Sequence, residues 1–403
     1  MTAQRLVLLF ALAAAPAAAQ NTLPDGAERQ TVATVCTACH DLGRITSAGH
    51  DRAGWRNVVE MMRNAGAQLP AEKVDAVADY LAAGFPPKPH PEAVAIAGPA
   101  KVTIREWEVP TPGSRPHDPL AGPDGAIWYT GQMANVLGRV DPATGKTREY
   151  RLPDGSGPHG LVADAAGAIW YTANFAGYIG RLDPKTGEVT KYPLPDPQAK
   201  DPHTPIFDQA GILWFTVQGA NRVGRLNPKT GEIRLETSPT PHSNPYGILV
   251  DKAGFPWYAE FGSDKLARID PKTLAIEEFT LPNPQSRPRR IAMTEDGVIW
   301  YTDYSRGYLG RFDPKTGAFA EYASPGGPNA QPYGITAIGD VVWYSESGVS
   351  PNTLVRFDSR QGKFQSWTIP SGGGVVRNMM PMGADKLVLA CSGVNRVALV
   401  EIR

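Results

Sequence analysis

A repeat of about 43 residues limits what most of this chain can fold into. Tryptophan recurs at intervals of 42 to 44 residues, and each copy contains four short apolar runs separated by turn residues. The repeat tryptophans are Trp128, Trp170, Trp214, Trp257, Trp300 and Trp343, and Val388 takes their place in a seventh copy. A period in the forties with four strands per copy is typical of the blades of a β-propeller.

The seventh copy ends after its third strand, at "VALVEIR". We expect "VTIREWEVP", residues 102–110, to supply the missing fourth strand from the other end of the repeat region. A ring of seven blades closed in this way leaves no free sheet edge. Lys plus Arg and Asp plus Glu each number 40, so no excess of positive charge favours nucleic acid. The expected partners are a small-molecule substrate and a redox protein.

The first 19 residues, "MTAQRLVLLFALAAAPAAA", predict a secretory signal peptide. Its apolar stretch is shorter than the ~20 residues that span a bilayer, and it ends in Ala-x-Ala. We therefore expect cleavage before Gln20, a periplasmic protein and no membrane span after cleavage.

The segment "VCTACHDLGR", residues 35–44, contains a Cys-x-x-Cys-His motif. The thiols of Cys36 and Cys39 have the spacing that forms thioethers to a porphyrin, and His40 is placed to ligate the iron. A disulfide or a redox dithiol would not need the histidine. A zinc site would need a second Cys or His pair, and none follows. The motif predicts covalent heme c.

Two helical patterns follow the heme motif. The first places Trp55, Val58, Val59 and Met62 on one face, so Met62 is favoured over Met61 as the second iron ligand. His50 or water is the alternative. From its heme motif to its "YLA" helix, this segment resembles a class I c-type cytochrome, which implies electron transfer. The predicted fold class is a small all-α cytochrome c domain (20–86), a linker (87–100) and an all-β seven-bladed β-propeller (101–403).

The first residue of each inner strand varies from copy to copy, while its surroundings do not. These residues are His117, His159, His203, Tyr246, Arg289, Tyr333 and Arg377. Inner strands line the channel of a propeller, so we expect a ring at one mouth, with Glu260, Asp303 and Glu346 in a neighbouring ring. Converging imidazoles suit a first-row metal or general base catalysis. The alternative is that each histidine only packs on the next blade.

The repeat "P-[HY]-G-I…W-[YF]-T…GR-[LI]-D…TG…LP" resembles the virginiamycin B lyase family over residues 101–403. This family opens a cyclic ester antibiotic by elimination, with magnesium, a histidine base and acidic ligands. The resemblance implies that His159, His203 and Tyr246 are catalytic and that Asp201, in the Asp-Pro-His that matches the family's Glu-Pro-His, holds Mg²⁺ or another divalent metal. From their places around the channel mouth, we expect His117 to be a further metal ligand and Arg289, Tyr333, Glu260 and Glu346 to bind the substrate.

The heme motif and the propeller together suggest a periplasmic oxidoreductase. A substrate or metal bound in the propeller would be oxidised, and the heme would pass the electron to a redox partner. The alternative is a magnesium-dependent carbon–oxygen lyase of the virginiamycin B type, with the cytochrome as an accessory domain. A third possibility is a propeller that only docks a protein partner.

Overall fold

A computed structural model describes residues 22–403 of the chain. The predicted signal peptide, residues 1–19, lies outside the described residues. The chain divides into two compact units, of which one contains residues 22–55 and 67–88 and the other contains residues 56–66 and 89–403. Within the described range, no helix has the length and apolar character needed to cross a membrane.

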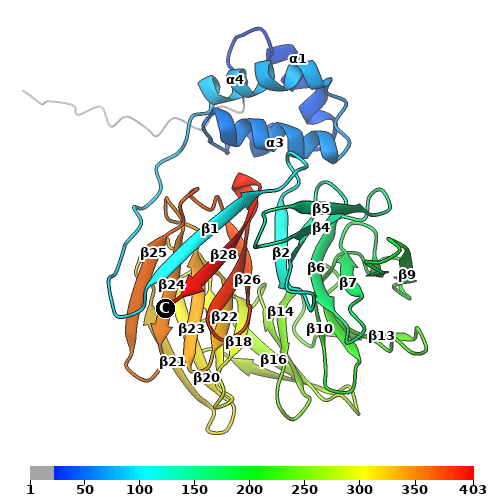
Figure 1. Ribbon diagram of the computed structural model, residues 1–403, viewed down its shortest axis with the longest axis vertical. Coiled ribbons are helices and arrows are strands. Elements are labelled where there is room, and N and C mark those ends of the chain that lie inside the picture. Colours follow the sequence, from blue (N-terminus) through cyan, green and yellow to red (C-terminus); the bar gives the residue numbers. More distant parts are fainter. Residues whose placement is uncertain (1–21) are drawn as a thin grey trace, which may run out of the picture. The chain divides into compact units, whose positions relative to one another are not determined.

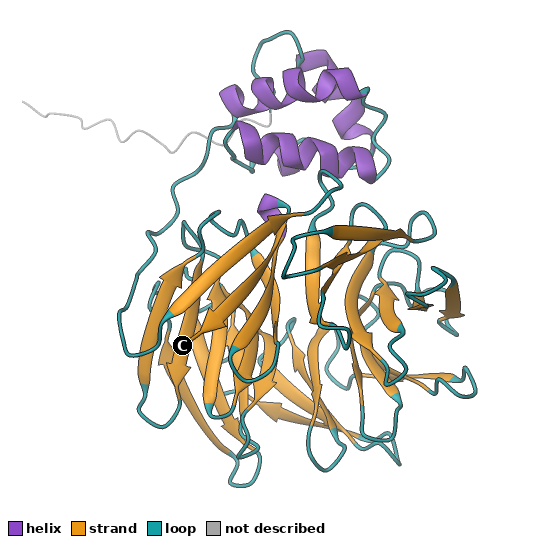
Figure 2. Cartoon of the chain, in the orientation of Figure 1, coloured by secondary structure: helices purple, strands orange, loops and turns teal. Residues whose placement is uncertain are grey.

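The helices are few and short, and almost all of them precede the repeats (Figure 2). They are α1 (Arg29–Val35), α2 (Gly43–Thr46), α3 (Arg52–Asn64) and α4 (Val74–Gly84), with 3₁₀ turns η1 (Cys36–Ala38) and η2 (Ala71–Lys73). A third 3₁₀ turn, η3 (Ser392–Val394), lies near the end of the chain. In the first unit Val32, Val77 and Leu81 are buried, and the indole of Trp55 donates a hydrogen bond to the carbonyl of Phe85 at 2.8 Å.

The predicted fold class is wrong in its first half, because no separate all-α cytochrome c domain is formed. Residues 56–66, most of α3, group with the propeller and not with the other helices. Polar side chains on this stretch explain the grouping. The amide of Asn57 donates to the carbonyl of Gly393 at 2.9 Å, and that of Asn64 donates to the carbonyl of Pro112 at 2.8 Å. The sequence pattern showed the apolar stripe of α3 but not the partner of its polar face.

The remainder of the described chain forms seven four-stranded antiparallel sheets. Many of their strands are labelled in Figure 1. The first three blades are β2 (Pro116–Ala121) to β5 (Thr147–Arg151), β6 (Pro158–Ala163) to β9 (Val189–Pro193), and β10 (Pro202–Phe207) to β13 (Ile233–Thr237). Their middle strands are β3 (Ile127–Gly131), β4 (Val136–Val140), β7 (Ile169–Ala173), β8 (Tyr178–Leu182), β11 (Leu213–Val217) and β12 (Arg222–Leu226).

The next three blades are β14 (Pro245–Val250) to β17 (Ile276–Thr280), β18 (Pro288–Met293) to β21 (Ala318–Ala323), and β22 (Pro332–Ile338) to β25 (Lys363–Thr368). Their middle strands are β15 (Pro256–Glu260), β16 (Lys265–Ile269), β19 (Ile299–Asp303), β20 (Tyr308–Asp313), β23 (Val341–Glu346) and β24 (Thr353–Asp358). The seventh blade contains β26 (Val376–Pro381), β27 (Lys386–Cys391), β28 (Arg396–Ile402) and β1 (Val102–Glu108).

The seventh blade is built from both ends of the repeat region, which confirms the prediction for residues 102–110. Strand β1 pairs antiparallel with β28, with Ile104 opposite Val400. Each inner strand packs on the inner strand of the next blade, and β26 packs on β2. These contacts close the ring, so the prediction of a seven-bladed propeller is also confirmed.

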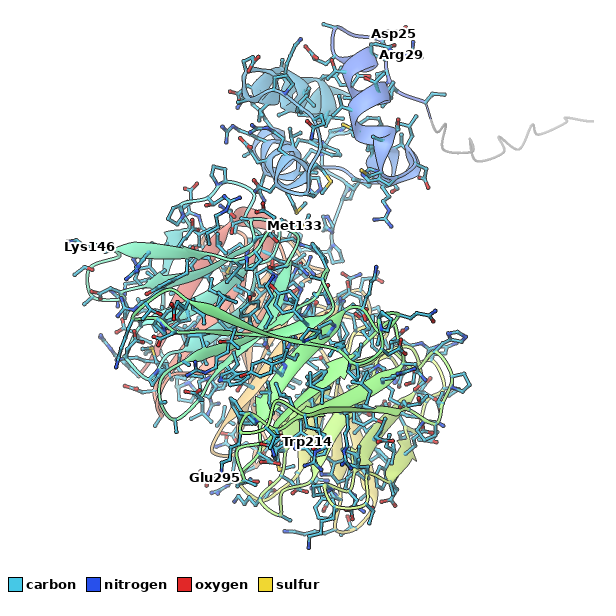
Figure 3. The ribbon with its side chains drawn as sticks, turned by 90° about the vertical axis from the view of Figure 1, so that its right-hand side faces the viewer. Asp25, Arg29, Met133, Lys146, Trp214 and Glu295 are labelled. Atoms are coloured by element: carbon cyan, nitrogen blue, oxygen red, sulfur yellow. The ribbon has the colours of Figure 1, made fainter. Side chains whose placement is uncertain are left out.

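The repeated tryptophans hold the blades together. The indole of Trp214 is buried and donates to Asp208, in the turn before its strand, at 2.8 Å. Trp170 and Trp257 make the same bond to Asp164 and Asp251. Figure 3 shows Trp214 within the propeller. This bond satisfies the indole N–H, which is the only hydrogen-bond donor of the side chain. Burial of the large ring between neighbouring blades stabilises their packing.

Candidate active site at the mouth of the bore

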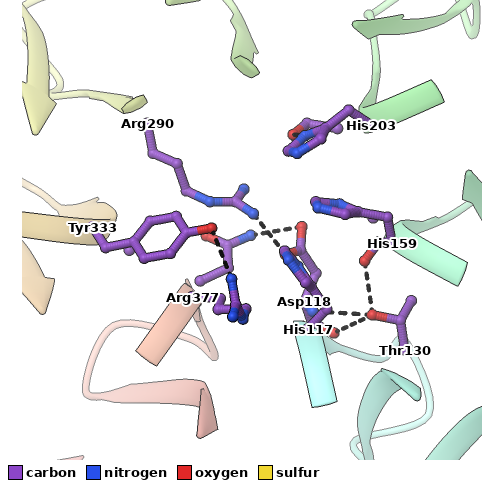
Figure 4. A network of polar contacts seen from close by, with 12 residues as sticks. His117, Asp118, Thr130, His159, His203, Arg290, Tyr333 and Arg377 are labelled. Atoms are coloured by element: carbon purple, nitrogen blue, oxygen red, sulfur yellow. Dashed lines mark hydrogen bonds and ion pairs between the residues drawn. The ribbon is translucent and has the colours of Figure 1, made fainter. Parts of the chain in front are cut away.

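Seven side chains, one from the start of each inner strand, lie around the bore of the propeller. They are His117, His159, His203, Tyr246, Arg289, Tyr333 and Arg377. The three imidazoles are neighbours, with ring centroids 3.6 Å apart between His117 and His159 and again between His159 and His203. The ring of His203 lies 4.0 Å from that of Tyr246. Figure 4 shows the histidines on one side of the bore and Tyr333 with Arg377 on the other.

A hydroxyl on the neighbouring blade fixes the backbone of most of these residues. Thr130, two positions after the repeat tryptophan, donates to the carbonyl of His159 at 2.7 Å. Thr172 donates to the carbonyl of His203 at 2.6 Å. The same bond comes from Thr216 to Tyr246 and from Thr302 to Tyr333. In the last blade Ser345 donates instead to the carbonyl of Val376, the residue before Arg377. The Trp-Tyr-Thr motif therefore sets the position of the next blade's side chain in the bore.

The bore contains a second layer of polar side chains that the sequence analysis did not identify. Asp118, Arg290 and Asn378 each follow directly after a ring residue. The Arg290 guanidinium donates to Asp118 at 2.6 Å, and the Asn378 amide donates to the other carboxylate oxygen at 3.0 Å. The sequence distinguishes these three residues from their counterparts, because the residue after the ring position is Gly or Thr in the other four blades.

The three histidines are neutral at physiological pH. Each is buried, and burial lowers its imidazole pKa well below the usual value, with nearby positive charges adding to the effect. His117 Nδ1 lies 2.9 Å from Asp118, and His203 Nδ1 lies 2.9 Å from the Thr204 hydroxyl. Among the described residues, His159 Nδ1 has no hydrogen-bond partner. The neutral rings keep lone pairs with which to accept a proton.

Arginine and tyrosine occupy the opposite side. The Arg289 guanidinium lies over the Tyr333 ring, 3.7 Å from its centroid, and Arg377 lies within 3.5 Å of the Tyr333 hydroxyl. The hydroxyls of Tyr246 and Tyr333 hydrogen-bond to each other. Burial alone would raise the Tyr333 pKa, but the guanidinium groups of Arg289, Arg377 and Arg290 lower it to about 8. Burial and the neighbouring tyrosine raise the pKa of Tyr246.

The acidic residues at the ends of the second strands bond within and between blades. Glu260 accepts from Ser238 at 2.5 Å and from Ser263 at 3.0 Å. Glu346 accepts from Ser324 at 2.6 Å and from Thr353 at 2.5 Å. Asp303 pairs with Arg306 at 3.0 Å. Their carboxylates are therefore occupied by partners other than the ring residues, and substrate binding by Glu260 and Glu346 stays a prediction.

Asp201 is the last residue of the loop that leads into β10, and it has a φ of +64°. Both of its carboxylate oxygens accept from the backbone N–H of Gly219, at 2.9 and 2.7 Å. Burial raises the pKa of Asp201 to about 6, although this hydrogen bond opposes the shift. Asp201 and His117 do not belong to one cluster of possible metal ligands. His117 clusters instead with Asp118 and His159, and the ligand atoms of these three residues lie within 4.8 Å of one another.

The residues of this cluster do not fit Mg²⁺. Magnesium prefers several oxygen ligands, and the cluster offers one carboxylate beside two imidazoles. That carboxylate already contacts Arg290, Asn378 and His117. The surrounding guanidinium groups would repel a divalent cation.

The residues of the heme motif lie in the first unit. Cys36 is half-buried, Cys39 is exposed, and both thiols are free. Burial raises the pKa of Cys36. The ring nitrogen Nδ1 of His40 lies 3.0 Å from the carbonyl of Asp41. Met62 lies on α3, in the stretch that groups with the propeller.

A cavity of about 330 Å³ extends from the second layer toward the other end of the bore. Asp118, Arg290 and Asn378 lie at its polar end, and apolar side chains such as Leu161, Ile248 and Met379 form its walls. The cross-bore ion pair therefore separates this apolar cavity from the histidine ring.

The sequence profile of the virginiamycin B lyase family matches residues 96–260 and 254–402. The virginiamycin B lyase of Saccharopolyspora erythraea is 43% identical over 51 residues, which is 13% of this chain and 17% of that protein. The selenomethionine-substituted virginiamycin B lyase of Staphylococcus aureus is 25% identical, with a TM-score of 0.68 over 75% of this chain and 99% of that one. A catalytically inactive variant of the S. aureus enzyme, solved with quinupristin, is 26% identical with the same TM-score and coverage.

Proposed function

Because the chain belongs to the virginiamycin B lyase family, we propose that it is a carbon–oxygen lyase acting at the ring of side chains in the bore. One observation carries the proposal: three adjacent neutral imidazoles face tyrosine and arginine across the same opening. An elimination next to a carbonyl needs a base for the α-hydrogen and positive charge for the oxygen that becomes negative. Both kinds of group are present in this ring.

His117 is the best oriented base. Its Nδ1 faces Asp118, which Arg290 and Asn378 hold in place, so the carboxylate fixes the orientation of the imidazole. This arrangement leaves Nε2 free to accept a proton. His159 and His203 pack beside it and share its low pKa. The imidazole takes the proton from the α-carbon. The electron pair of the broken C–H bond forms the new double bond, and the electron pair of the C–O bond leaves with the oxygen.

The Tyr246 and Tyr333 hydroxyls are suited to return a proton to the leaving oxygen. Arg289 and Arg377 are suited to stabilise negative charge on the carbonyl oxygen of the substrate. The magnesium of other family members has no place in this scheme, since the donor set around His117 does not suit that ion. Positive charge from arginine takes the electrostatic role.

The test is an elimination assay on quinupristin and on a set of β-acyloxy and β-alkoxy carbonyl compounds. The conjugated double bond of the product gives an ultraviolet absorbance. We expect turnover without added metal and a loss of about 10²- to 10⁴-fold in His117→Ala. His242→Ala, on an exposed loop, is the control and should keep full activity. No turnover of any member of the set, or equal rates in His117→Ala, would contradict the proposal.

The free thiols of Cys36 and Cys39 support a second candidate function, electron transfer by a bound heme. They would hold a porphyrin by thioether bonds, with His40 as an iron ligand, and such a group supplies one-electron transfer when bound. Buried apolar side chains of the same unit, among them Val32 and Ile45, suit a porphyrin face. Under this second candidate function, the protein is exported to the periplasm, and the heme accepts electrons from the oxidation of a substrate.

Heme content measured per chain, after export from a host that matures c-type heme, tests this candidate. We expect one heme per chain and a red protein band that survives denaturation. The double variant Cys36→Ser with Cys39→Ser should lose the band. A colourless wild-type protein from a competent host would refute this candidate and leave the lyase proposal intact.

A further inference from the structure

The bore carries a large excess of positive charge for a chain whose formal net charge is zero. Four guanidinium groups lie in or beside it, and they belong to Arg115, Arg289, Arg290 and Arg377. Even Arg115, whose pKa burial lowers to about 9, is protonated at pH 7. Asp118 is the carboxylate that pairs with this group, and its partner is Arg290. Three guanidinium charges therefore lack an acidic partner among the residues that the structure describes.

Arg289 is held by aromatic rings and not by an acid. Its guanidinium carbon lies 3.7 Å from the centroid of Tyr333, 4.3 Å from that of Tyr304 and 4.6 Å from that of Phe261. Its buried Nε has no hydrogen-bond partner in the described part of the protein. Stacking on aromatic faces orients the plane of the group, and its terminal N–H groups reach the Tyr246 hydroxyl, but neither contact supplies a negative charge.

Arg377 shows the same shortage of acceptors. Its buried Nε is also unpartnered among residues 22–403, and its Nη1 donates a long hydrogen bond of 3.5 Å to the Tyr333 hydroxyl. The unpartnered Nδ1 of His159, which is 97% buried, lies in the same ring. Buried donors without a partner are unfavourable, so the two unpartnered guanidinium Nε groups favour a ligand that accepts hydrogen bonds.

Glu260, Asp303 and Glu346 do not supply the missing negative charge. Each bonds to side chains of its own or the adjacent blade, as described above. The charge at the mouth is therefore available to a bound molecule.

We propose that the ring binds the carboxylate of an organic acid, with Arg289 and Arg377 as its principal contacts. The substrate class is a carboxylate that carries an ester or ether oxygen on its β-carbon, such as a uronic acid residue in glycosidic linkage. This inference rests on the proposed lyase function and names its substrate. A planar guanidinium matches the two oxygens of a carboxylate.

Neutralising the carboxylate also makes the elimination feasible. Removing the α-hydrogen places a second negative charge on the carboxylate, and the paired guanidinium groups stabilise that charge. Neutral His117 takes the proton, the C–H pair becomes the double bond, and the β-oxygen leaves with the C–O pair and receives a proton from tyrosine. No oxidant or metal is needed to balance the step.

Calorimetric titration of the full chain with D-glucuronate and with its methyl ester tests the inference, because the two ligands differ in one charge. We expect the acid to bind at least tenfold more tightly than the ester. Arg289→Gln and Arg377→Gln should each weaken acid binding tenfold or more. Arg234→Gln, an exposed arginine on the outer strand β13, is the matched control and should bind as the wild type does.

Equal affinity for acid and ester, or no heat of binding with the acid, would overturn the inference even if a variant failed to fold. Tighter binding of inorganic phosphate than of glucuronate would also overturn it, as would competition by Mg²⁺ for the same site. Arginine-dependent binding of glucuronate, without elimination from any carboxylate that carries a β-ester or β-ether oxygen, would leave this inference standing and refute the lyase. Elimination of neutral esters without glucuronate binding would do the opposite.

Discussion

Asp118 and Arg290 come from inner strands 172 residues apart, and their side chains meet across the bore at 2.6 Å. Both are almost fully buried. The pair joins the first blade to the fifth across the bore, beside the three histidines (Figure 4). It also ties the orientation of His117 to the closure of the propeller, since the same carboxylate oxygen faces both groups.

Breaking this pair from the acidic side should destabilise the fold. Asp118→Asn leaves the Arg290 guanidinium buried without a negatively charged partner. Removing one partner of a buried ion pair lowers the free energy of unfolding by about 3 to 5 kcal/mol. The double variant Asp118→Asn with Arg290→Met removes both charges and should recover part of the loss. Denaturant unfolding of the wild type, both single variants and the double variant measures the coupling. Asp154→Asn, in an exposed pair with Arg151, should change stability by less than about 1 kcal/mol.

The hydroxyl of Thr172 should control the position of His203. It donates to the carbonyl of His203 and accepts from the N–H of Gly160 at 2.9 Å. Thr172→Val has nearly the same shape but leaves these backbone groups unpaired, so we expect a loss of about 1 to 3 kcal/mol. Thr172→Ser keeps the hydroxyl and should stay within about 1 kcal/mol of the wild type. An unchanged His203 imidazole NMR signal in the valine variant would show that the hydroxyl does not position the ring.

The repeat was sufficient to predict the propeller, its closure and the residues that open each inner strand. The repeat tryptophans set the period, and a Pro directly before the ring residue in six blades marked the start of the inner strand. Asp118 and Arg290 were missed because neighbours along a regular strand point to opposite faces. Here the pairing register shifts between Pro116 and Pro119, and both His117 and Asp118 reach the bore.

Other parts of the site depend on packing that a repeat pattern does not contain. Glu260 falls at the predicted position, opposite Pro245, yet its carboxylate turns to Ser238. The helical segment gave a similar result. Trp55 and Val59 of the predicted stripe on α3 are buried, whereas Val58 and Met62 are only half-buried. Asn57 and Asn64 of the same helix bond to residues of the second unit. A net charge of zero also concealed the arginine cluster, because composition does not record where charges gather.

Tyr333 should ionise at an unusually low pH. The lowered pKa of about 8 compares with about 10 for an unfolded tyrosine. Between these values the folded protein has released a proton that the unfolded chain keeps, so stability relative to Tyr333→Phe should rise from pH 8 to 10. The gain is about 1 to 3 kcal/mol, and it is lost as the pH falls through 8.

Ultraviolet difference titration detects this tyrosinate directly. One tyrosine should titrate near pH 8 in the wild type and not in Tyr333→Phe. Arg289→Gln removes a neighbouring positive charge and should move the transition to higher pH. A wild-type titration with every tyrosine near pH 10 or above would contradict the prediction.

Asp201 should make the protein less stable as it ionises. Its pKa is raised to about 6, compared with about 3.9 in an unfolded chain, so the folded protein keeps a proton that the unfolded chain loses from pH 4 to 6. Stability contributed by this residue therefore falls as pH rises through that window.

Asp201→Asn avoids the charge, tolerates the positive φ and keeps an acceptor for Gly219. Relative to the wild type, it should gain about 1 to 2 kcal/mol between pH 4 and pH 7, discounted for partial exposure. Urea unfolding at the two pH values measures the difference, with Asp154→Asn as control. The prediction is contradicted if Asp201→Asn differs from the wild type by the same free energy of unfolding at pH 4 and at pH 7. If, in addition, Mg²⁺ stabilises the wild type but not the variant, Asp201 is a metal ligand.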